Sequence, residues 1–549
     1  MNIHGHNKQS GCRRVRLRRW CVMAGWLCAM SAPCSVDADS MNAANQAPRT
    51  PSAVEYHKGI AHLAAGEIKQ AEKAFNTSLR HDPKNVDAYL GKAELARRQN
   101  RLDEAASLVK RALELAPQDP RVHLARGRHL IGKRQFKDAE SALERATALF
   151  PGFADAHMEL GDLRADLLKK PREAANAYRA AVQANPMLWR AHYGLALQQA
   201  KIGASDEAHR AFTEARKLAP SNPLPLYAEG NLYAKEGKPD QALHAFNEAL
   251  QVKSDSVPIL LARADLYRLA THQFEKAAED YRTVLKLAAH EGRAHNGLAL
   301  ALKEAGNIGE AIEHLKLAGR LNPKVPGPWF ELGRLYGQQK KYGDAIKAFE
   351  AAVKADAKFV PAVVGRADMY LAQGKYEPAL SDYSEALKLT PNSSPLHVKI
   401  GVAHARQRHW SEAERLFKKA IELNPKAAEA WNNLAWIVIE RKQNPDDAVA
   451  WARKAVDLEP ARAVNHDTLG WAYRARGDLT KAATSLARAA ELDPKDPVIQ
   501  YHCGVVYAEQ QKLGAAREAL RNALSLDQAF DGADDARQRL SSLSQAAAG

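Results

Sequence analysis

Cysteine is almost absent from this 549-residue chain beyond its first 34 residues. Four of the five cysteines (Cys12, Cys21, Cys28 and Cys34) lie in that leader, and Cys503 is the only one that follows. The remainder of the chain therefore has no intramolecular disulfide available to it. Cys503 stands where other parts of the sequence have leucine, so we predict a buried small hydrophobic residue there and not a reactive thiol.

Strand-forming residues and catalytic motifs are scarce as well. Aromatic residues make up 7% of the chain, alanine and leucine are abundant, and no stretch alternates between polar and apolar residues as a strand would. We find no phosphate-binding loop G-x-x-x-x-G-K-[ST], no H-E-x-x-H, no C-x-x-C and no G-x-S-x-G. The sequence therefore predicts an all-α, non-enzymatic protein with no cofactor and no metal site.

What the chain does contain is a landmark residue that returns every 34 or 35 residues. A period of this size is typical of repeat proteins. Fourteen repeats of this kind extend from about residue 52 to residue 530. The landmarks are Pro83, Pro117, Pro151, Pro186, Pro220, Ser254, Ala289, Pro323, Ala357, Pro391, Pro425, Pro460, Pro494 and Gln528.

Each repeat also has a recurring set of large and small residues. A small residue precedes the landmark by five positions and usually an aromatic residue or leucine precedes it by eight, as Ala420 and Phe417 precede Pro425. Two repeats show the first half of the pattern well, with Trp329, Leu332, Gly333 and Tyr336 in one and Leu469, Gly470 and Tyr473 in the other. Together these residues resemble the tetratricopeptide repeat, whose pattern is W-x-x-L-G-x-x-Y, then A-x-x-x-F, then P.

The spacing of these residues predicts two amphipathic helices per repeat. Small residues let the two helices approach each other, and large residues fill the space around that contact, so the helices form an antiparallel pair. Asx-Pro steps such as Asp82-Pro83 end the second helix. Since one pair cannot bury its apolar face alone, we expect residues 52–530 to form one solenoid, a right-handed superhelix, with a capping helix within residues 531–549.

The first 38 residues have the order of a bacterial export signal. Five arginines between residues 13 and 19 are followed by an apolar stretch from Trp20 to Ala32, which is shorter than the roughly 20 residues of a membrane span. We predict cleavage after Ala38, a flexible linker over residues 39–51, and a periplasmic or other cell-envelope location. Retention of the segment as an uncleaved inner-membrane anchor is the alternative, and either way it would engage the export machinery or the inner membrane.

The net charge favours acidic partners. Of the formal charge of +15, +5 belongs to residues 1–51 and +10 to the repeats. A moderately basic surface attracts an acidic peptide or an anionic polysaccharide. Nucleic acid is not expected, because basic residues are dispersed among many acidic ones and no recognised nucleic-acid-binding module is present.

Histidines recur at one position of the pattern, the fourth of the repeat. Successive members lie one repeat apart, and stacked helices are about 8–10 Å apart, which is too far for two such imidazoles to share one zinc ion. We therefore interpret them as half-buried residues that replace the usual aromatic one. They are His123, His157, His192, His295, His397 and His466.

Partner-binding residues are expected on the first helices, which the resemblance places on the inner wall of the solenoid. Helical geometry puts positions 2, 5, 9 and 12 of each repeat away from its buried face. Repeats two and three place Arg97, Arg121 and Arg128 there, with Arg98 beside them, and repeat four places Asp155, Asp162 and Asp166. Repeats eleven to fourteen contribute Asn432, Trp436, Trp471, Arg474 and Tyr501, with Arg406 at the edge.

These surfaces have two interpretations. Aromatic and arginine side chains are common carriers of binding energy, so they are candidates for holding a peptide or a sugar. Alternatively, Trp436 and Trp471 fill space between neighbouring first helices, and the arginines form a solvated face. The sequence lacks three consecutive repeats with the lysine and asparagine set of a carboxylate clamp, which disfavours a co-chaperone.

The function that follows from these observations is that of a scaffold. We expect protein partners in a cell-envelope assembly, with exopolysaccharide biosynthesis or export as the specific hypothesis. A module that binds an anionic glycan directly, and a regulatory subunit of a membrane-associated enzyme, remain as alternatives. Repeat framework residues report how helices stack and do not identify a partner.

Overall fold

The computed structural model describes residues 50–545, and within them every regular element is a helix. These residues form 29 α-helices and one π-helical segment, which confirms the all-α prediction. The predicted export signal and residues 39–49 of the predicted linker lie outside the described residues. The chain divides after Ile259 into two compact halves. Among the helices of residues 50–545, none is both long enough and apolar enough to cross a membrane.

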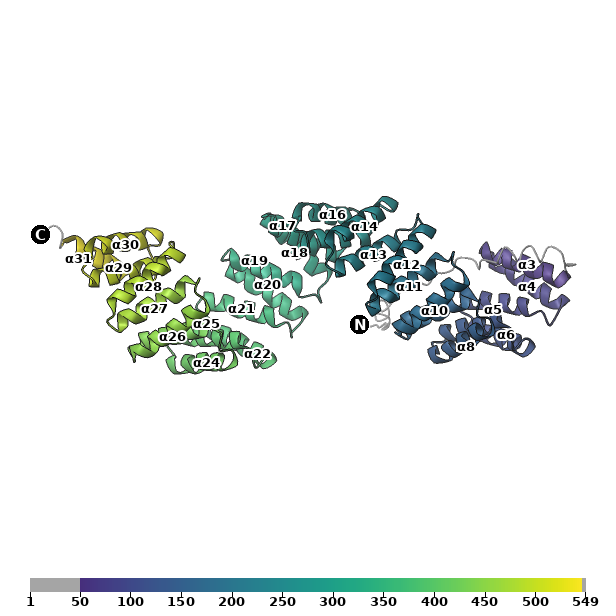
Figure 1. Cartoon of the computed structure of the whole chain (residues 1–549), viewed down its shortest axis with the longest axis horizontal. Helices are drawn as coiled ribbons and strands as arrows, with labels where there is room; N and C mark the ends of the chain where they lie inside the picture. Colours follow the sequence, from purple (N-terminus) through teal and green to yellow (C-terminus); the bar gives the residue numbers. More distant parts are fainter. Residues whose placement is uncertain (1–49, 546–549) are drawn as a thin grey trace, which may run out of the picture. The chain divides into compact units, whose positions relative to one another are not determined.

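The helices follow one another as fourteen pairs, one pair per predicted repeat, with a single helix at the end (Figure 1). Those of the N-terminal half are α3 Pro51–Ala64, α4 Ile68–His81, α5 Val86–Arg98, α6 Leu102–Leu115, α7 Pro120–Gly132, α8 Phe136–Leu149, α9 Ala154–Asp162 with the π-helical segment η1 Leu163–Leu167, α10 Pro171–Ala184, α11 Trp189–Ile202, α12 Ser205–Leu218, α13 Leu224–Lys235 and α14 Pro239–Val252.

The next helix, α15 Val257–Leu269, contains the division between the halves. It is followed by α16 Phe274–Leu287, α17 Gly292–Glu304, α18 Ile308–Leu321, α19 Gly327–Gln338, α20 Tyr342–Ala355, α21 Val360–Ala372, α22 Tyr376–Leu389, α23 Ser394–Arg406, α24 Trp410–Leu423, α25 Ala428–Glu440, α26 Pro445–Leu458, α27 Ala463–Ala475, α28 Leu479–Leu492, α29 Pro497–Glu509, α30 Leu513–Leu526 and α31 Ala533–Gln545.

The landmark residues mark where each pair ends. In all fourteen repeats the second helix stops two residues before the landmark, as α24 stops at Leu423 before Pro425. The residue between them takes an extended or nearly extended backbone because a residue before proline is disfavoured in the helical region. Repeats whose landmark is not proline, such as the one at Ala357, end in the same way.

The turn between the two helices of a pair has a recurring backbone conformation. One residue per repeat has a positive φ, and in six repeats that residue is glycine, as at Gly374 with φ 69°. In the other eight it carries a side chain, as at Lys340 with φ 57°. A left-handed residue is the usual end of a helix, because it turns the chain while its N–H still bonds a helical carbonyl. The next helix therefore starts after only a few residues.

The core explains why the two helices of a repeat and the following repeat stack. The ring of Phe75 on α4 lies against Gly59 of α3 and Gly91 of α5. A Cβ atom added to either glycine would come within 2.5 or 2.6 Å of that ring. Phe349 lies in the same way between Gly333 and Gly365. Each large ring thus fills the space that two glycines leave, one in its own repeat and one in the next.

The repeat that ends at Pro186 is one residue longer than most, and the π-helical segment accommodates the extra residue. A π-turn bonds residues five apart and so absorbs an insertion without ending the helix. At the other end of the chain, α31 packs its Ala533 and Ala536 against Leu520 and Ala523 of α30. This helix lies in the tail where the sequence predicted a cap.

Candidate functional site

Arginines predicted for the groove of repeats two and three have acidic partners. Arg97 bonds Glu94 through two nitrogens at 2.7 Å, and Arg98 bonds the same carboxylate at 2.9 Å. Burial raises the pKa of Glu94, but the hydrogen bonds from these arginines outweigh that effect and hold the pKa below its usual value. Arg128 on α7 bonds Glu159 on α9 at 2.9 Å. These pairs favour a role for Arg97 and Arg128 in bracing the helices.

Arg121 is similarly engaged, and Asp162 of repeat four is bonded within its own repeat. Arg121 contacts Asp87 at 2.6 Å and Asp119 at 2.7 Å, so it connects repeats two and three. Asp162 is half-buried, accepts a hydrogen bond from the Tyr178 hydroxyl at 2.7 Å, and has a pKa raised to about 6 by desolvation. Asp155 and Asp166 lie elsewhere on the same first helix and its π-helical end.

The C-terminal candidates Trp471, Arg474 and Tyr501 do come together. The Trp471 ring stacks on His502 of α29 with centroids 3.9 Å apart, and the Arg474 guanidinium lies 4.4 Å from the Trp471 ring centroid. Arg474 also bonds Glu509 of α29 at 3.0 Å. These contacts join α27 to α29, which is the space-filling role that the sequence left open for Trp471.

Tyr501 closes the same cluster toward the last helix. Its hydroxyl donates to Asp535 of α31 at 2.8 Å, and its ring packs near Phe530 with centroids 5.7 Å apart. Burial raises the pKa of Tyr501 to about 12. Tyr501 therefore secures α31 to α29.

Asn432 and Trp436 lie on α25 but differ in exposure. Trp436 leaves 38% of its surface exposed, and its ring lies 5.8 Å from that of Trp410 on α24. Asn432 is buried, with no hydrogen-bond partner for its Oδ1. Arg406 is exposed at the last residue of α23. Of the predicted aromatic residues, Trp436 is thus the most available to a ligand.

The fourth-position histidines have a shared structural contact. His123, His157, His192 and His466 each place Nε2 2.8–2.9 Å from the carbonyl oxygen of the landmark proline six residues earlier. His295 makes the same contact with Ala289 at 3.1 Å, and His397 uses Nδ1 to reach Ser393. Within residues 50–545, no cluster of three metal-ligating side chains is found. The histidines therefore hold the junction between repeats, as Trp431 does through its indole nitrogen.

Cys503 matches its predicted role. Its thiol is buried, and burial raises its pKa to about 12. A thiol with so high a pKa is protonated and unreactive at neutral pH.

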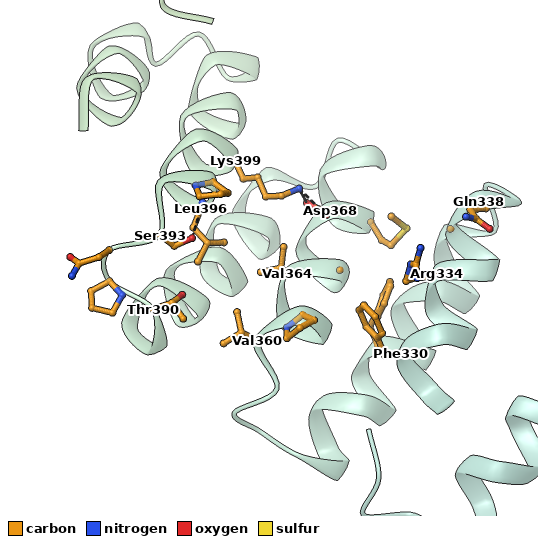
Figure 2. A pocket seen from close by; sticks show the side chains of 18 residues that line it. Phe330, Arg334, Gln338, Val360, Val364, Asp368, Thr390, Ser393, Leu396 and Lys399 are labelled. Atoms are coloured by element: carbon orange, nitrogen blue, oxygen red, sulfur yellow. Dashed lines mark hydrogen bonds and ion pairs between the residues drawn. The ribbon is translucent and has the colours of Figure 1, made fainter. Parts of the chain in front are cut away.

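A hollow lies on first helices that the candidates above did not include. It has a volume of about 1010 Å³ and is lined mainly by α19, α21 and α23. Figure 2 shows Phe330 and Arg334 of α19 on one side, Val360 and Val364 of α21 in the middle, and Leu396 of α23 opposite. Three successive repeats thus line one apolar depression.

The polar wall of the hollow is built from two helices. Lys399 of α23 bonds both carboxylate oxygens of Asp368 on α21, at 2.8 and 3.0 Å. Asp368 also accepts the hydroxyl of Tyr383 at 2.5 Å. Across the hollow, Arg334 contacts Glu331 through Nη1 at 3.2 Å. The arrangement offers apolar contact together with an exposed guanidinium.

A second hollow, of about 810 Å³, lies between α12 and α14. His209 there stacks on Tyr233 at 4.2 Å and contacts Glu229 at 3.2 Å and Glu236 at 3.3 Å. Its walls are mostly charged side chains that pair with one another.

Four residues that line the larger hollow occupy positions 5 and 9, where the sequence predicts partner-binding residues. Phe330 and Val364 occupy position 5 of repeats nine and ten, and Arg334 and Asp368 occupy position 9. Phe330 and Arg334 have the aromatic and arginine character of the predicted candidates but were not among them, whereas Val364 carries no such signal. Applying the same positions to every repeat would have found these four residues.

Comparisons with known proteins agree with the repeat pattern. The family described as tetratricopeptide repeat matches residues 56–120, 124–167, 168–223, 227–271 and 266–326. The family described as cilia and flagella-associated protein 70 C-terminal domain matches residues 329–541. Together these matches extend over nearly all of the predicted solenoid.

Relatives of known function match parts of the chain. Anaphase-promoting complex subunit 6 of Arabidopsis thaliana is 26% identical over 38% of this chain and 39% of its own length. Protein CTR9 homolog of the same plant is 26% identical over 54% of this chain and 31% of its own length. The chain thus spans between 31% and 39% of these relatives. In the solved structure of the APC/C hetero-tetramer Cut9–Hcn1, a chain that is 17% identical aligns over 89% of this chain and 96% of its own, with a TM-score of 0.39.

Proposed function

The chain belongs to the tetratricopeptide repeat family, and on that premise we propose that it is a scaffold that holds protein partners through its first helices. The observation that carries the proposal is the hollow lined by α19, α21 and α23. Apolar hollows with a few polar groups are the usual form of a binding site. Relatives named as subunits of the anaphase-promoting complex support a place in a multiprotein assembly.

Site-specific photocrosslinking tests this proposal. A benzoylphenylalanine at Gln338, at the edge of the hollow, should crosslink a defined partner in cells of the source organism. The same residue at Glu350, exposed on the second helix α20, is the control. The Val364→Arg variant should abolish the Gln338 crosslink, with circular dichroism confirming its fold. Identical crosslinks from both positions, or none from Gln338, would contradict the role of the hollow.

We further propose that the assembly lies in the cell envelope and serves exopolysaccharide biosynthesis or export. The support is the charged and then apolar order of residues 13–32. Mass spectrometry of the native protein should find an N-terminus near Asp39. An intact Met1 would favour retention as an inner-membrane anchor, and a cytoplasmic native protein would contradict the proposal.

Direct binding of an anionic glycan is a second candidate. The exposed Trp436 ring beside Trp410 favours it, because an exposed aromatic face stacks on sugar rings. Binding of a purified anionic glycan in the absence of any protein partner would distinguish this function from a protein scaffold. Control of an enzyme would instead appear as a change in that enzyme's activity when the array is added.

A further inference from the structure

We propose that the hollow between α19, α21 and α23 binds an acidic, aliphatic segment of a partner protein. In this assignment, which rests on the scaffold function, an aliphatic side chain of the segment packs on Val360 and Val364, and a neighbouring aspartate or glutamate pairs with Arg334. The site thereby recognises an aliphatic side chain and a neighbouring carboxylate of the segment together.

The floor of the hollow accounts for the preference for an aliphatic side chain. Val360, Val364 and Leu396 line it with the ring of Phe330 (Figure 2). Leu396 is buried beneath the depression, whereas Val360 and Val364 are half-buried and offer apolar surface to it. Burial of apolar surface against such a floor is favourable in proportion to the area removed from water.

The charged residues of the wall account for the preference for an acidic segment. Arg334, Lys399 and Asp368 are the charged groups that line the hollow. Both oxygens of Asp368 are occupied, by Lys399 and by the Tyr383 hydroxyl. A basic ligand would therefore have to displace Lys399 from its carboxylate, whereas an acidic ligand meets no uncompensated anion.

Arg334 is the group that remains to bind a carboxylate. Its side chain is 48% exposed, and its contact with Glu331 uses Nη1 alone, at 3.2 and 3.3 Å. Exposed pairs within one helix contribute little stability, so the guanidinium is readily shared. Its fork of N–H donors matches a carboxylate in a bidentate arrangement.

The extent of the hollow suits a short extended segment. Its volume of about 1010 Å³ is at the upper end of the range of about 300–1,000 Å³ that is typical of ligand pockets. It also extends over three repeats, so a segment several residues long can contact all three first helices. Several contacts of this kind allow sequence preference.

Selection from a random dodecapeptide library displayed on phage tests the assignment. The immobilised full-length chain should enrich peptides in which aspartate or glutamate adjoins leucine, isoleucine or valine. A fluorescent copy of the most enriched peptide should lose about tenfold in affinity with Arg334→Gln, measured by anisotropy.

A matched variant controls for loss of charge alone. Arg488 is 52% exposed and contacts Glu491 three residues away at 2.9 Å, which closely resembles the Arg334–Glu331 pair. Arg488→Gln should leave the affinity unchanged. An alginate oligomer at equal charge should leave the bound peptide in place, because it lacks the aliphatic side chain.

Several results would overturn the assignment. These are a basic consensus, no consensus at all, the same consensus from the Arg334→Gln protein, or displacement of the peptide by alginate. If any of them appears while the Gln338 crosslink persists and Val364→Arg removes it, the acidic–aliphatic assignment fails and the scaffold function stands. If the crosslink itself is missing, the hollow is not the docking surface and both proposals fail.

Discussion

Trp471 is held by two close neighbours, whereas Trp436 leaves part of its surface in solvent. His502 covers one face of Trp471, and Arg474, itself bonded to Glu509, lies 4.4 Å from the ring centroid. Trp436 has a tilted contact with Trp410. The same residue type at corresponding positions of two repeats therefore braces helices in one and faces water in the other.

The two tryptophans should differ when each is replaced. Trp471→Ala removes a stack and a cation–π contact, so we expect a loss of about 2–3 kcal/mol of stability. Trp436→Ala should cost about 1 kcal/mol or less, because its ring is less enclosed. Thermal unfolding of the two single variants measures the difference. Equal losses of stability would contradict the prediction that the more exposed Trp436 contributes less than Trp471.

Buried histidines make stability depend on pH. Burial lowers the pKa of His129, His314 and His404 below the ordinary value, and His295, whose Nδ1 lies 2.8 Å from Nδ1 of His314, adds repulsion at His314. The unfolded chain, in which a histidine pKa is about 6.5, then binds more protons than the folded chain. Their contribution to stability is present above about pH 6.5 and is lost as the pH falls below it.

We therefore expect the melting temperature to fall between pH 7 and pH 5. The slope should be shallower in His314→Gln, which removes one of these groups. Replacement of His244, which is exposed on α14, by glutamine is the control and should leave the slope unchanged. A melting temperature that rises toward pH 5, or an unchanged slope in His314→Gln, would contradict the assignment.

Residue roles were only partly predictable from the sequence. The positions of Arg97, Arg121 and Arg128 on first helices followed from the repeat register, and the spacing of Glu94 three residues before Arg97 is that of a pair within one helix. The contacts of Arg121 with Asp87 and of Arg128 with Glu159 join neighbouring repeats and did not follow from the register. A period in the sequence carries no information on such pairings.

At the scale of the helix pair, the contact between a ring and two glycines decides how closely the helices approach. Gly401 of α23 faces Phe417 of α24, and a Cβ atom on Gly401 would come within 2.6 Å of the ring. In repeat two, Ala93 packs in one cluster with the smaller Val109. Where alanine replaces glycine on the first helix, the smaller valine thus replaces the aromatic ring on the second helix.

Gly401→Ala should destabilise the protein by about 1–3 kcal/mol, because the added methyl group forces the ring to move. The same change should cost less when Phe417 is already valine, since the two sites share one volume. Denaturant unfolding of the two single variants and the double variant gives the coupling. Simple additivity would show that the close approach is relieved elsewhere.

Helix ends were the most predictable part of the elements. The end of every second helix followed from the landmark, even at Ser254, Ala289, Ala357 and Gln528 where no proline stands. The π-helical segment was not predicted, because the extra residue of that repeat showed only as a period of 35. A count of residues does not tell whether a helix or a turn takes up the insertion.

At the scale of the whole chain, stability is built from contacts between neighbouring repeats. In such arrays the free energy is approximately a sum of repeat terms and nearest-neighbour terms. The all-α pairing and the number of repeats were predicted from the sequence because every repeat restates the same pattern. The hollow was not, since three different repeats supply its walls.

A local change should consequently remain local. We expect Gly401→Ala to speed hydrogen exchange in α21–α26 and to leave α3–α8 at the rates of the unaltered protein. Mass spectrometry after hydrogen exchange resolves the two regions. Faster exchange in both would show that the array opens as one cooperative body.

The left-handed turns also make the chain suitable as a molecular ruler. Lys340, Arg408 and Gln511 all carry side chains at positive φ, so a cysteine at these turns adds little backbone strain. Cys503 is buried with a pKa of about 12, so in a preparation that lacks the leader a maleimide label would react at the new site alone. Because the turns recur once per repeat, spectroscopic probes can be attached at regular intervals along the array without altering a helix.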